Sequence, residues 1–150
     1  MSGGPDLRAP AGGPSPGVTP RRVLMVASEM TPFAKSGGLG DVTAALPRAL
    51  ARLGHEVTVV VPRYRGVSVD GLSAEEFDLD MGGHRYWARC FVQELEPRMR
   101  VVLVDHPGLF DREGLYGQGS HDYEDNPRRF AFLSLAALEF ARREGQRVDV

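Results

Sequence analysis

A lysine followed by a glycine-rich segment is the part of this sequence best suited to bind a ligand. Lys35 directly precedes SGGLGD at residues 36–41. Glycine lets the backbone approach a ligand closely. The free N–H groups and the positive dipole end at the start of a following helix favour an anion, and the lysine adds a compact, mobile positive charge. The segment therefore predicts a site for a phosphate or a polyhydroxylated ligand.

The rarity of lysine strengthens this prediction, because the chain has 17 arginines and a single lysine. The simpler alternative is a flexible turn with an incidental lysine. Two standard phosphate motifs do not fit. Lys35 stands before the glycines, whereas a P-loop lysine follows them, and Thr43 occupies the place of the third glycine of the dinucleotide pattern. Arg63, after a later strand, could hold the 2′-phosphate of NADP, so an NADP-binding half of an oxidoreductase stays open.

Three further side chains follow predicted strands, at the edge where open parallel sheets bind ligands. Glu29 ends the first strand, Arg63 follows the second, and Tyr116 lies in a long loop after a third. We expect these groups to converge with the glycine-rich segment. Other polar side chains of the same loop are interpreted as solvated rather than as a metal site: His121, Asp122, Glu124 and Asp125.

The composition excludes several classes of protein. The 150 residues are 42% hydrophobic and 25% charged, which is typical of one globular domain. No apolar run is long enough to span a membrane, and a net charge of −2 argues against a dedicated nucleic-acid binder. The lone cysteine, Cys90, forms neither an internal disulfide nor a CxxC zinc site. A cytoplasmic location fits these features.

The two ends of the chain differ in character. Residues 1–21 are rich in glycine and proline and carry few apolar side chains, so we predict a disordered tail. Residues 22–150 form the predicted domain. Its final residues, 148–150, resemble the opening of a buried strand, which predicts that the chain is a piece of a longer protein.

Two apolar runs with an amphipathic segment between them predict a βαβ unit. The strands are expected at residues 23–29 and 57–61, and the helix at 41–53, with Asp41 as its N-cap and Gly54 just beyond its end. The internal Pro47 predicts a kink or a frayed first turn. The buried helix face is expected to carry the apolar residues that recur at steps of three and four: Val42, Ala45, Leu46, Ala49, Leu50 and Leu53.

The second half predicts a hairpin, a strand and a helix. Segments 76–81 and 85–93 flank a Gly-Gly turn, and 100–105 is a further strand. After the long loop, a helix is expected to begin at Asn126, its N-cap. Its buried stripe would hold Phe130, Leu133, Ala137 and Phe140. Together the elements predict a doubly wound, Rossmann-like α/β domain with a parallel sheet and an inserted hairpin.

These residues resemble a known family. The stretch at 23–64, VLMVASEMTPFAKSGGLGDVTAALPRALARLGHEVTVVVPRY, is similar to the amino terminus of bacterial glycogen synthases and plant starch synthases. The lysine-x-Gly-Gly-Leu signature of that family stands at residues 35–39. The later stretches FDREGLYG (110–117) and DYEDNPRRFAFLSLAALE (122–139) are also similar. The resemblance covers about residues 22–150.

The resemblance implies part of the amino-terminal domain of a GT-B glycosyltransferase. Such an enzyme transfers glucose, with retention, from ADP-glucose to the non-reducing end of glycogen or another α-1,4-glucan. It implies donor-binding roles for Lys35, Gly37 and Gly38, and positions near the sugar for Asp41 and Tyr116. Glu29 and Arg63 are weaker candidates for contacts in the cleft. No cofactor is implied beyond the donor substrate, and neither a nucleic acid nor a membrane is an expected partner.

The resemblance also implies that much of the family's catalytic machinery lies outside residues 22–150. We therefore expect the 150-residue chain alone to lack transferase activity. The nucleobase pocket belongs to the second domain of such enzymes, so these residues do not distinguish ADP-glucose from UDP-glucose. A non-catalytic glucan-binding module stays open as a further alternative.

Overall fold

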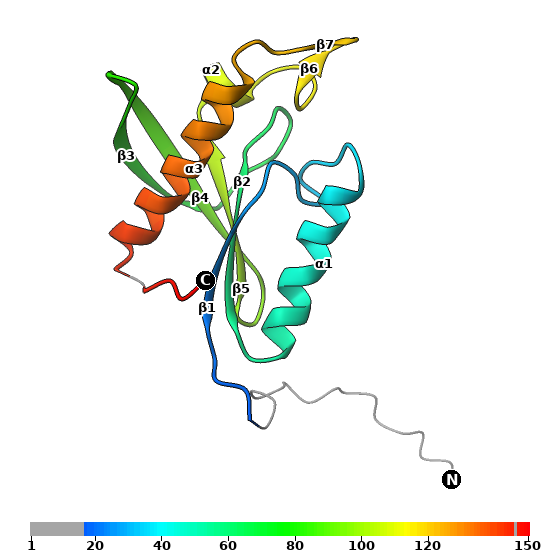
Figure 1. Cartoon of the computed structure of the whole chain (residues 1–150), viewed down its shortest axis with the longest axis vertical. Coiled ribbons are helices and arrows are strands. Elements are labelled where there is room, and N and C mark those ends of the chain that lie inside the picture. The colour runs from blue at the N-terminus through cyan, green and yellow to red at the C-terminus, as the bar shows by residue number, and fades with distance from the viewer. Residues whose placement is uncertain (1–16, 146) are drawn as a thin grey trace.

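The computed structural model describes residues 17–145 and 147–150 (Figure 1). Most of the predicted disordered tail, residues 1–16, lies outside the described residues. The elements, in chain order, are β1 (Arg22–Val26), α1 (Gly38–Arg52), β2 (Glu56–Pro62), β3 (Ser73–Met81), β4 (His84–Glu96), β5 (Met99–Asp105), α2 (Pro107–Phe110), β6 (Gly117–Gln118), β7 (His121–Asp122) and α3 (Asn126–Arg143).

A five-stranded sheet in the order β1-β2-β5-β4-β3 forms the centre of the fold. The first three strands of that order are parallel, and β4 runs antiparallel to both of its neighbours. Helix α1 covers one face of the sheet and α3 covers the other (Figure 1). This arrangement confirms the Rossmann-like α/β prediction, with the β3–β4 hairpin as its insertion.

Alternation along the buried strands produces two cores. In β2, Val59 and Val61 face α1, whereas Val60 faces α3. In β5, Val102 and Val104 likewise join the α3 side. Because successive side chains of a strand point to opposite faces, a continuous apolar run is what a strand covered on both faces requires.

The hairpin agrees with its prediction. Gly82 and Gly83 both have positive φ, 59° and 77°, and Met81 pairs with His84 across the turn. Alternate residues of β4 pack against the α3 core: Tyr86, Ala88, Cys90 and Val92.

The predicted start and buried face of α1 are wrong. The helix begins at Gly38, with Gly37 rather than Asp41 at the N-cap, and it continues without a break across Pro47 to Arg52. Val42 is 57% exposed and Leu46 is 45% exposed. Ala45, Ala49 and Leu53 are exposed as well, and Leu50 is half-buried. The residues that face the sheet are small or lack large apolar side chains: Gly40, Thr43, Ala44, Pro47 and Ala51.

The physical reason lies in the close packing of this helix on the sheet. Small side chains such as Ala44 and Ala51 fit against the valines of β2. The hydroxyl of Thr43 donates to the carbonyl of Leu39, 2.9 Å away, which satisfies a buried polar group within the helix. The larger apolar side chains of α1, whose spacing produces the hydrophobic periodicity of this segment, therefore lie on the helix face turned away from the sheet. The expected end signal is correct, because Gly54 has a positive φ of 100° just beyond the helix.

Three other boundaries differ from the predictions. Strand β1 ends at Val26, three residues before Glu29, because the chain turns there into the loop that carries the glycines. Asp125, rather than Asn126, occupies the N-cap of α3. Val150 is 74% exposed, so no buried strand forms at residues 148–150. The backbone there does pair with β1, however, because the Leu24 amide donates to the Val150 carbonyl at 2.9 Å.

Candidate functional site

The carboxylate of Glu29 organises the glycine-rich loop from beneath. Glu29 is only 3% exposed. Its Oε2 accepts hydrogen bonds from the backbone N–H groups of Ser36 at 2.6 Å and Gly37 at 3.4 Å. Its Oε1 accepts from the Ser36 hydroxyl at 2.6 Å and from the Tyr116 hydroxyl at 2.5 Å. One side chain therefore joins the segment after β1, the glycine-rich loop and the late loop between α2 and α3 (residues 111–125).

These donors keep Glu29 ionised. Burial by itself raises the pKa of this carboxyl, but the hydrogen bonds from Ser36, Tyr116 and the Gly37 amide together hold it below its ordinary value. Both carboxylate oxygens are occupied within the fold. In this structure Glu29 supports the loop, whereas the resemblance gave it as one of the weaker candidates for a contact in the cleft.

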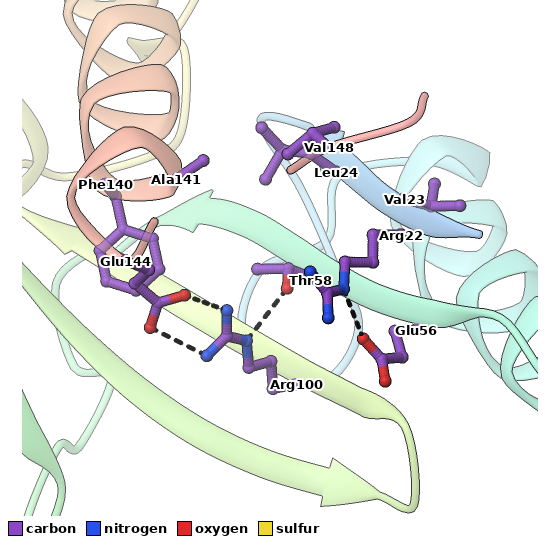
Figure 2. Close-up of a pocket in the computed structure, with 10 residues that line it drawn as sticks. All are labelled: Arg22, Val23, Leu24, Glu56, Thr58, Arg100, Phe140, Ala141, Glu144 and Val148. Atoms are coloured by element: carbon purple, nitrogen blue, oxygen red, sulfur yellow. Dashed lines mark hydrogen bonds and ion pairs between the residues drawn. The ribbon is translucent and has the colours of Figure 1, made fainter. Parts of the chain in front are cut away.

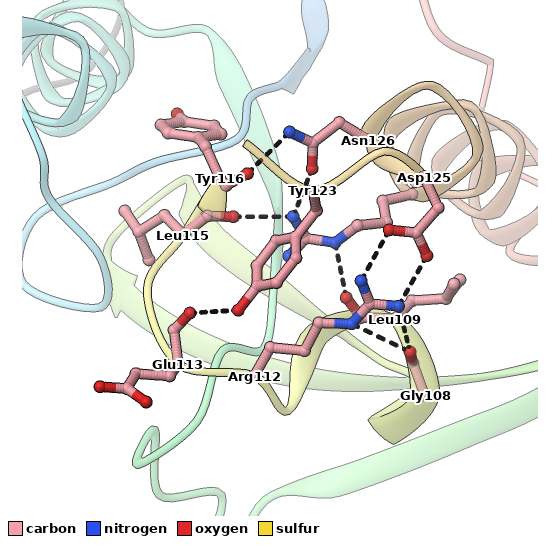
Figure 3. Close-up of polar contacts among 10 residues, drawn as sticks. Gly108, Leu109, Arg112, Glu113, Leu115, Tyr116, Tyr123, Asp125 and Asn126 are labelled. Atoms are coloured by element: carbon pink, nitrogen blue, oxygen red, sulfur yellow. Dashed lines mark hydrogen bonds and ion pairs between the residues drawn. The ribbon is translucent and has the colours of Figure 1, made fainter. Parts of the chain in front are cut away.

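Tyr116 reaches Glu29 from the loop that carries β6 and β7. Its hydroxyl also shares a 2.7 Å hydrogen bond with the Ser28 hydroxyl. Its backbone carbonyl accepts from the Asn126 side-chain amide at 2.8 Å (Figure 3) and from the Tyr123 amide at 2.9 Å. Burial and the neighbouring Glu29 raise the pKa of Tyr116, so its hydroxyl remains a proton donor at neutral pH.

Lys35 and Asp41 form an ion pair above the loop. The Lys35 Nζ lies 2.8 Å from Oδ1 and 2.7 Å from Oδ2 of Asp41, and the Thr31 hydroxyl donates to Oδ1 at 3.3 Å. The hydrogen bond from Lys35 is the main cause that lowers the pKa of Asp41. The two side chains are 50% and 56% exposed, so a ligand can reach both.

Gly37 and Gly38 are glycines that the fold itself does not require. Both are exposed, and a Cβ built on either would find nothing within 4 Å. Gly37 is in extended backbone at φ −160°, which any residue adopts. Gly40 differs, since its Cβ would lie 3.2 Å from the Ala34 carbonyl. The open space above Gly37 and Gly38 is where a ligand could approach the backbone.

Arg63 does not join this group. It donates to the Asp105 carboxylate at 3.3 Å and to the Val67 carbonyl at 3.1 Å, and its guanidinium lies over the Phe91 ring. Its Nε and Nη1 are thus engaged beside the ends of β2 and β5. The 2′-phosphate role that kept the NADP alternative open therefore has no support in the geometry.

Sequence reasoning missed several residues that build the site. Ser28 and Ser36 hold Tyr116 and Glu29, and Asn126 and Arg129 hold the late loop. The adjacency of Ser36 to Lys35 was a usable signal. No periodic pattern marks Ser28, whose partner Tyr116 is 88 positions away, or Arg129, which donates to two backbone carbonyls 14 and 20 positions away.

An enclosed cavity lies at the other end of the sheet. Figure 2 shows it between α3 and the amino-terminal ends of the parallel strands. Arg100 bridges Glu144 and Thr58 there, with its Nε 3.0 Å from the Thr58 hydroxyl, and Arg22 pairs with Glu56 at 3.0 Å. These ion pairs join strands to helix and strand to strand, which is a structural role.

Beside Tyr116 an open groove continues the candidate site. It is lined by Ser28, Tyr116, Phe130 and Ser134 together with apolar side chains. The rings of Tyr116 and Phe130 lie 5.8 Å apart. Hydroxyl groups and aromatic edges suit the polar and apolar surfaces of a sugar ring.

The part of the chain that the structure describes contains neither a candidate metal site nor a candidate membrane-spanning helix. Its His, Cys, Asp and Glu side chains form no group of three or more that could hold a metal ion. Asp125, one of the polar loop residues, is instead paired with Arg112 at 2.6 Å. None of the helices in residues 17–145 is long and apolar enough to cross a membrane.

The fold and site define a class: a Rossmann-like α/β unit with a candidate ligand site, formed by the Lys35–Asp41 pair and the neighbouring glycines, beyond the carboxyl end of its first parallel strand. Comparison with known proteins gives the family. The family model described as the starch synthase catalytic domain matches residues 22–150. The chain belongs to this family.

Similar proteins carry related names. The chain is 44% identical to glycogen synthase 2 of Geobacter sulfurreducens over 135 residues, which is 86% of this chain and 27% of that protein. It is 44% identical to the glycogen synthase of Myxococcus xanthus over 131 residues, 81% of this chain and 26% of that protein. The catalytic domain of starch synthase IV from Arabidopsis thaliana, bound to ADP and acarbose, matches with a TM-score of 0.68 and 34% identity. That match covers 87% of this chain and 27% of the solved chain.

Proposed function

We propose that this chain contributes the donor-binding edge of a glycogen or starch synthase. The reaction is the retaining transfer of glucose from ADP-glucose to the non-reducing end of an α-1,4-glucan such as glycogen. One observation carries the proposal: a half-exposed lysine stands beside two glycines that the fold does not need, at the ligand-binding edge of the sheet. Membership of the family and a solved relative bound to ADP and acarbose support this reading.

Each group has a chemical part in this proposal. The Lys35 ammonium neutralises the donor diphosphate, and the open backbone at Gly37 and Gly38 lets the donor approach closely. Asp41, released from Lys35, accepts a hydrogen bond from a sugar hydroxyl. Tyr116 lies at the sugar, beside the groove. Glu29 holds the loop in place through Ser36 and the Gly37 amide.

Lys35 changes partners in this scheme. In the structure its charge is balanced by Asp41, and both side chains are solvated. Exposed ion pairs contribute little to stability, so a diphosphate can replace Asp41 at small cost. A retaining transfer must stabilise the departing diphosphate, and a lysine that gains a doubly charged partner provides part of that stabilisation.

The chain spans about 27% of the curated relatives it matches, so the test uses a chimera. Residues 22–150 replace the matching segment of the Geobacter sulfurreducens glycogen synthase 2. We then measure incorporation of labelled glucose from ADP-glucose into glycogen, with UDP-glucose as the competing donor. We expect incorporation from ADP-glucose, and none from the 150-residue chain alone.

Two results would count against the proposal. One is a folded chimera that transfers no glucose while the parental synthase does. The other comes from the 150-residue chain itself, measured by NMR with ADP-glucose. If NADPH perturbs the amides of residues 36–41 and ADP-glucose does not, an oxidoreductase role replaces the transferase. If only a malto-oligosaccharide perturbs the domain, a non-catalytic glucan-binding role replaces it.

A further inference from the structure

Arg129 is the largest side chain that is fully buried in the described residues, with no exposed surface. It stands in the first turn of α3, and its guanidinium lies over the rings of Phe110, Tyr123 and Phe130 at 5.1 to 5.6 Å. No carboxylate among the described residues forms an ion pair with it. Its second terminal nitrogen, Nη2, has no hydrogen-bond partner there either. The Asp125 carboxylate, which is paired with Arg112, balances this charge only at longer range. A buried charge without a direct ion-pair partner is costly.

The remaining donors of Arg129 reach one acceptor in α2, one in the loop between α2 and α3, and one in the first turn of α3. Its Nε donates to the Leu109 carbonyl at 2.7 Å, and its Nη1 donates to the Leu115 carbonyl at 2.9 Å and to the Asn126 side-chain oxygen at 2.7 Å. In Figure 3 the acceptor atoms of Leu109, Leu115 and Asn126 lie close together, and their dashed lines lead to the same side chain. The planar guanidinium reaches all three from two separate nitrogens, Nε and Nη1. The three donors of a lysine radiate from one nitrogen and do not reproduce this spread.

Two of these acceptors flank Tyr116 directly. Leu115 is the preceding residue, and the Asn126 amide, oriented by Arg129, donates to the Tyr116 carbonyl at 2.8 Å. The Tyr116 hydroxyl then donates to Glu29, which holds the Ser36 and Gly37 amides. A continuous path of hydrogen bonds thus connects the start of α3 to the glycine-rich loop.

We propose that Arg129 is a positioning residue, which fixes the Tyr116 hydroxyl against Glu29 and thereby sets the glycine-rich loop for the donor. The placement of Tyr116 follows from the contacts alone; its consequence for glucose transfer rests on the function proposed above. Arg129 does not itself line the groove, although its guanidinium lies over the Phe130 ring that does. Its hydrogen bonds reach the site through Leu115 and Asn126, which adjoin Tyr116.

A double-mutant cycle separates this role from a general structural one. Arg129→Lys, Tyr116→Phe and the double variant are compared in the chimera, with Arg128→Lys, an exposed arginine of the same helical turn, as the matched control. Small misplacements near a reacting centre cost as much as about 100-fold in rate. We expect Arg129→Lys to lower kcat/KM for ADP-glucose by about 10- to 100-fold. The double variant should lose no more activity than Tyr116→Phe alone. The control should match the unmodified chimera. Independent, multiplicative losses would overturn the proposal.

A second readout needs no activity. The Glu29 carboxyl is followed by ¹³C NMR titration in the 150-residue chain. Since the Tyr116 hydroxyl is one of the groups that lower the pKa of Glu29, both Tyr116→Phe and Arg129→Lys should raise it, and the double variant should show the Tyr116→Phe value. An unchanged pKa of Glu29 in folded Arg129→Lys contradicts the proposal, even if the chimera makes no glucan.

If Arg129→Lys does not fold, Asn126→Asp provides the same test. That change keeps the oxygen that Arg129 contacts and removes the amide donor to the Tyr116 carbonyl. The same upward shift of the Glu29 pKa is expected, and its absence in the folded variant overturns the proposal. Failure of the transferase assay together with the expected NMR shifts refutes only the proposed function.

Discussion

Lys35 and Asp41 hold each other through two hydrogen bonds, with the lysine Nζ 2.8 Å and 2.7 Å from the two carboxylate oxygens. The pair spans the exposed mouth of the glycine-rich loop. Before a ligand arrives, the positive charge is therefore already neutralised and already oriented. An anion with two or more charges is the kind of ligand that can displace the carboxylate.

Replacing Lys35 should damage activity far more than folding. In the chimera we expect Lys35→Ala to lower turnover by about 100-fold or more, since removing one donor to a developing negative charge costs this much in other enzymes. The thermal midpoint should change little, because the pair is exposed. Lys35→Arg should also be poor, since a planar fork does not replace a compact ammonium. Kinetics and thermal unfolding check this, and full activity in Lys35→Arg would contradict it.

Gly37→Ala and Gly38→Ala should fold as well as the parent and bind ADP-glucose worse. Neither new methyl group meets an atom within 4 Å, and alanine favours the helical backbone of Gly38 by up to about 1 kcal/mol. A donor lying on that backbone would meet the methyl group. Thermal unfolding and calorimetric titration of the chimera measure the two effects.

The matched control for those variants is Gly114→Ala. Gly114 has a positive φ of 73°, and a Cβ there would lie 2.2 Å from the Gly117 carbonyl, so this change should lower stability. Equal loss of stability in all three variants would show that Gly37 and Gly38 serve the fold rather than a ligand.

Acid should loosen the loop through Glu29. The folded-state pKa of Glu29 lies below the unfolded value of 4.5, so its contribution to stability is fully present above that pH and is lost as the pH falls through the folded pKa. The difference in unfolding free energy between the parent chain and Glu29→Gln should therefore shrink on acidification from pH 7. Urea unfolding at several pH values measures this, with the exposed Glu124→Gln as control. A difference that grows in acid would contradict the assignment.

The single tryptophan provides a sensor of His106. The Trp87 and His106 rings are stacked, 5.0 Å between centroids and 20° between planes. Burial lowers the pKa of His106 from 6.5, so the imidazole is neutral at pH 7 and becomes cationic only in more acidic solution. Because a cationic imidazole quenches indole emission, Trp87 fluorescence should fall with a midpoint below pH 6.5. His106→Asn should abolish the transition, and a midpoint above pH 6.5 would contradict the effect of burial on His106.

Strand positions were predictable because burial on both faces leaves few alternatives to a continuous apolar run. Helix α1 shows the limit of that approach. Its buried face holds Ala44 and Ala51, whereas Val42 and Leu46 are exposed. Periodicity measures where large apolar side chains lie, and close packing of a helix against valines selects small ones instead. Only the facing sheet reveals which surface is buried.

The glycine-rich loop of the candidate site could be predicted from the sequence, but the residues that hold this loop in place could not. The lysine and the glycines are adjacent in sequence, so their spacing alone indicated a ligand site. The contact between Glu29 and Tyr116 joins residues 87 positions apart, and Arg129 acts on carbonyl groups that any residue type carries. Local patterns contain no information about such partners.

One carboxylate beneath the glycine-rich loop has a consequence for motion. Since Glu29 receives two loop amides on one oxygen and the Tyr116 hydroxyl on the other, the two loops cannot detach independently without leaving a buried charge short of donors. Opening of either loop must disturb both, as a single cooperative unit of local unfolding. Hydrogen exchange at the amides of Ser36 and Gly37 would then follow the local opening of the loop around Tyr116, about eighty residues further along the chain.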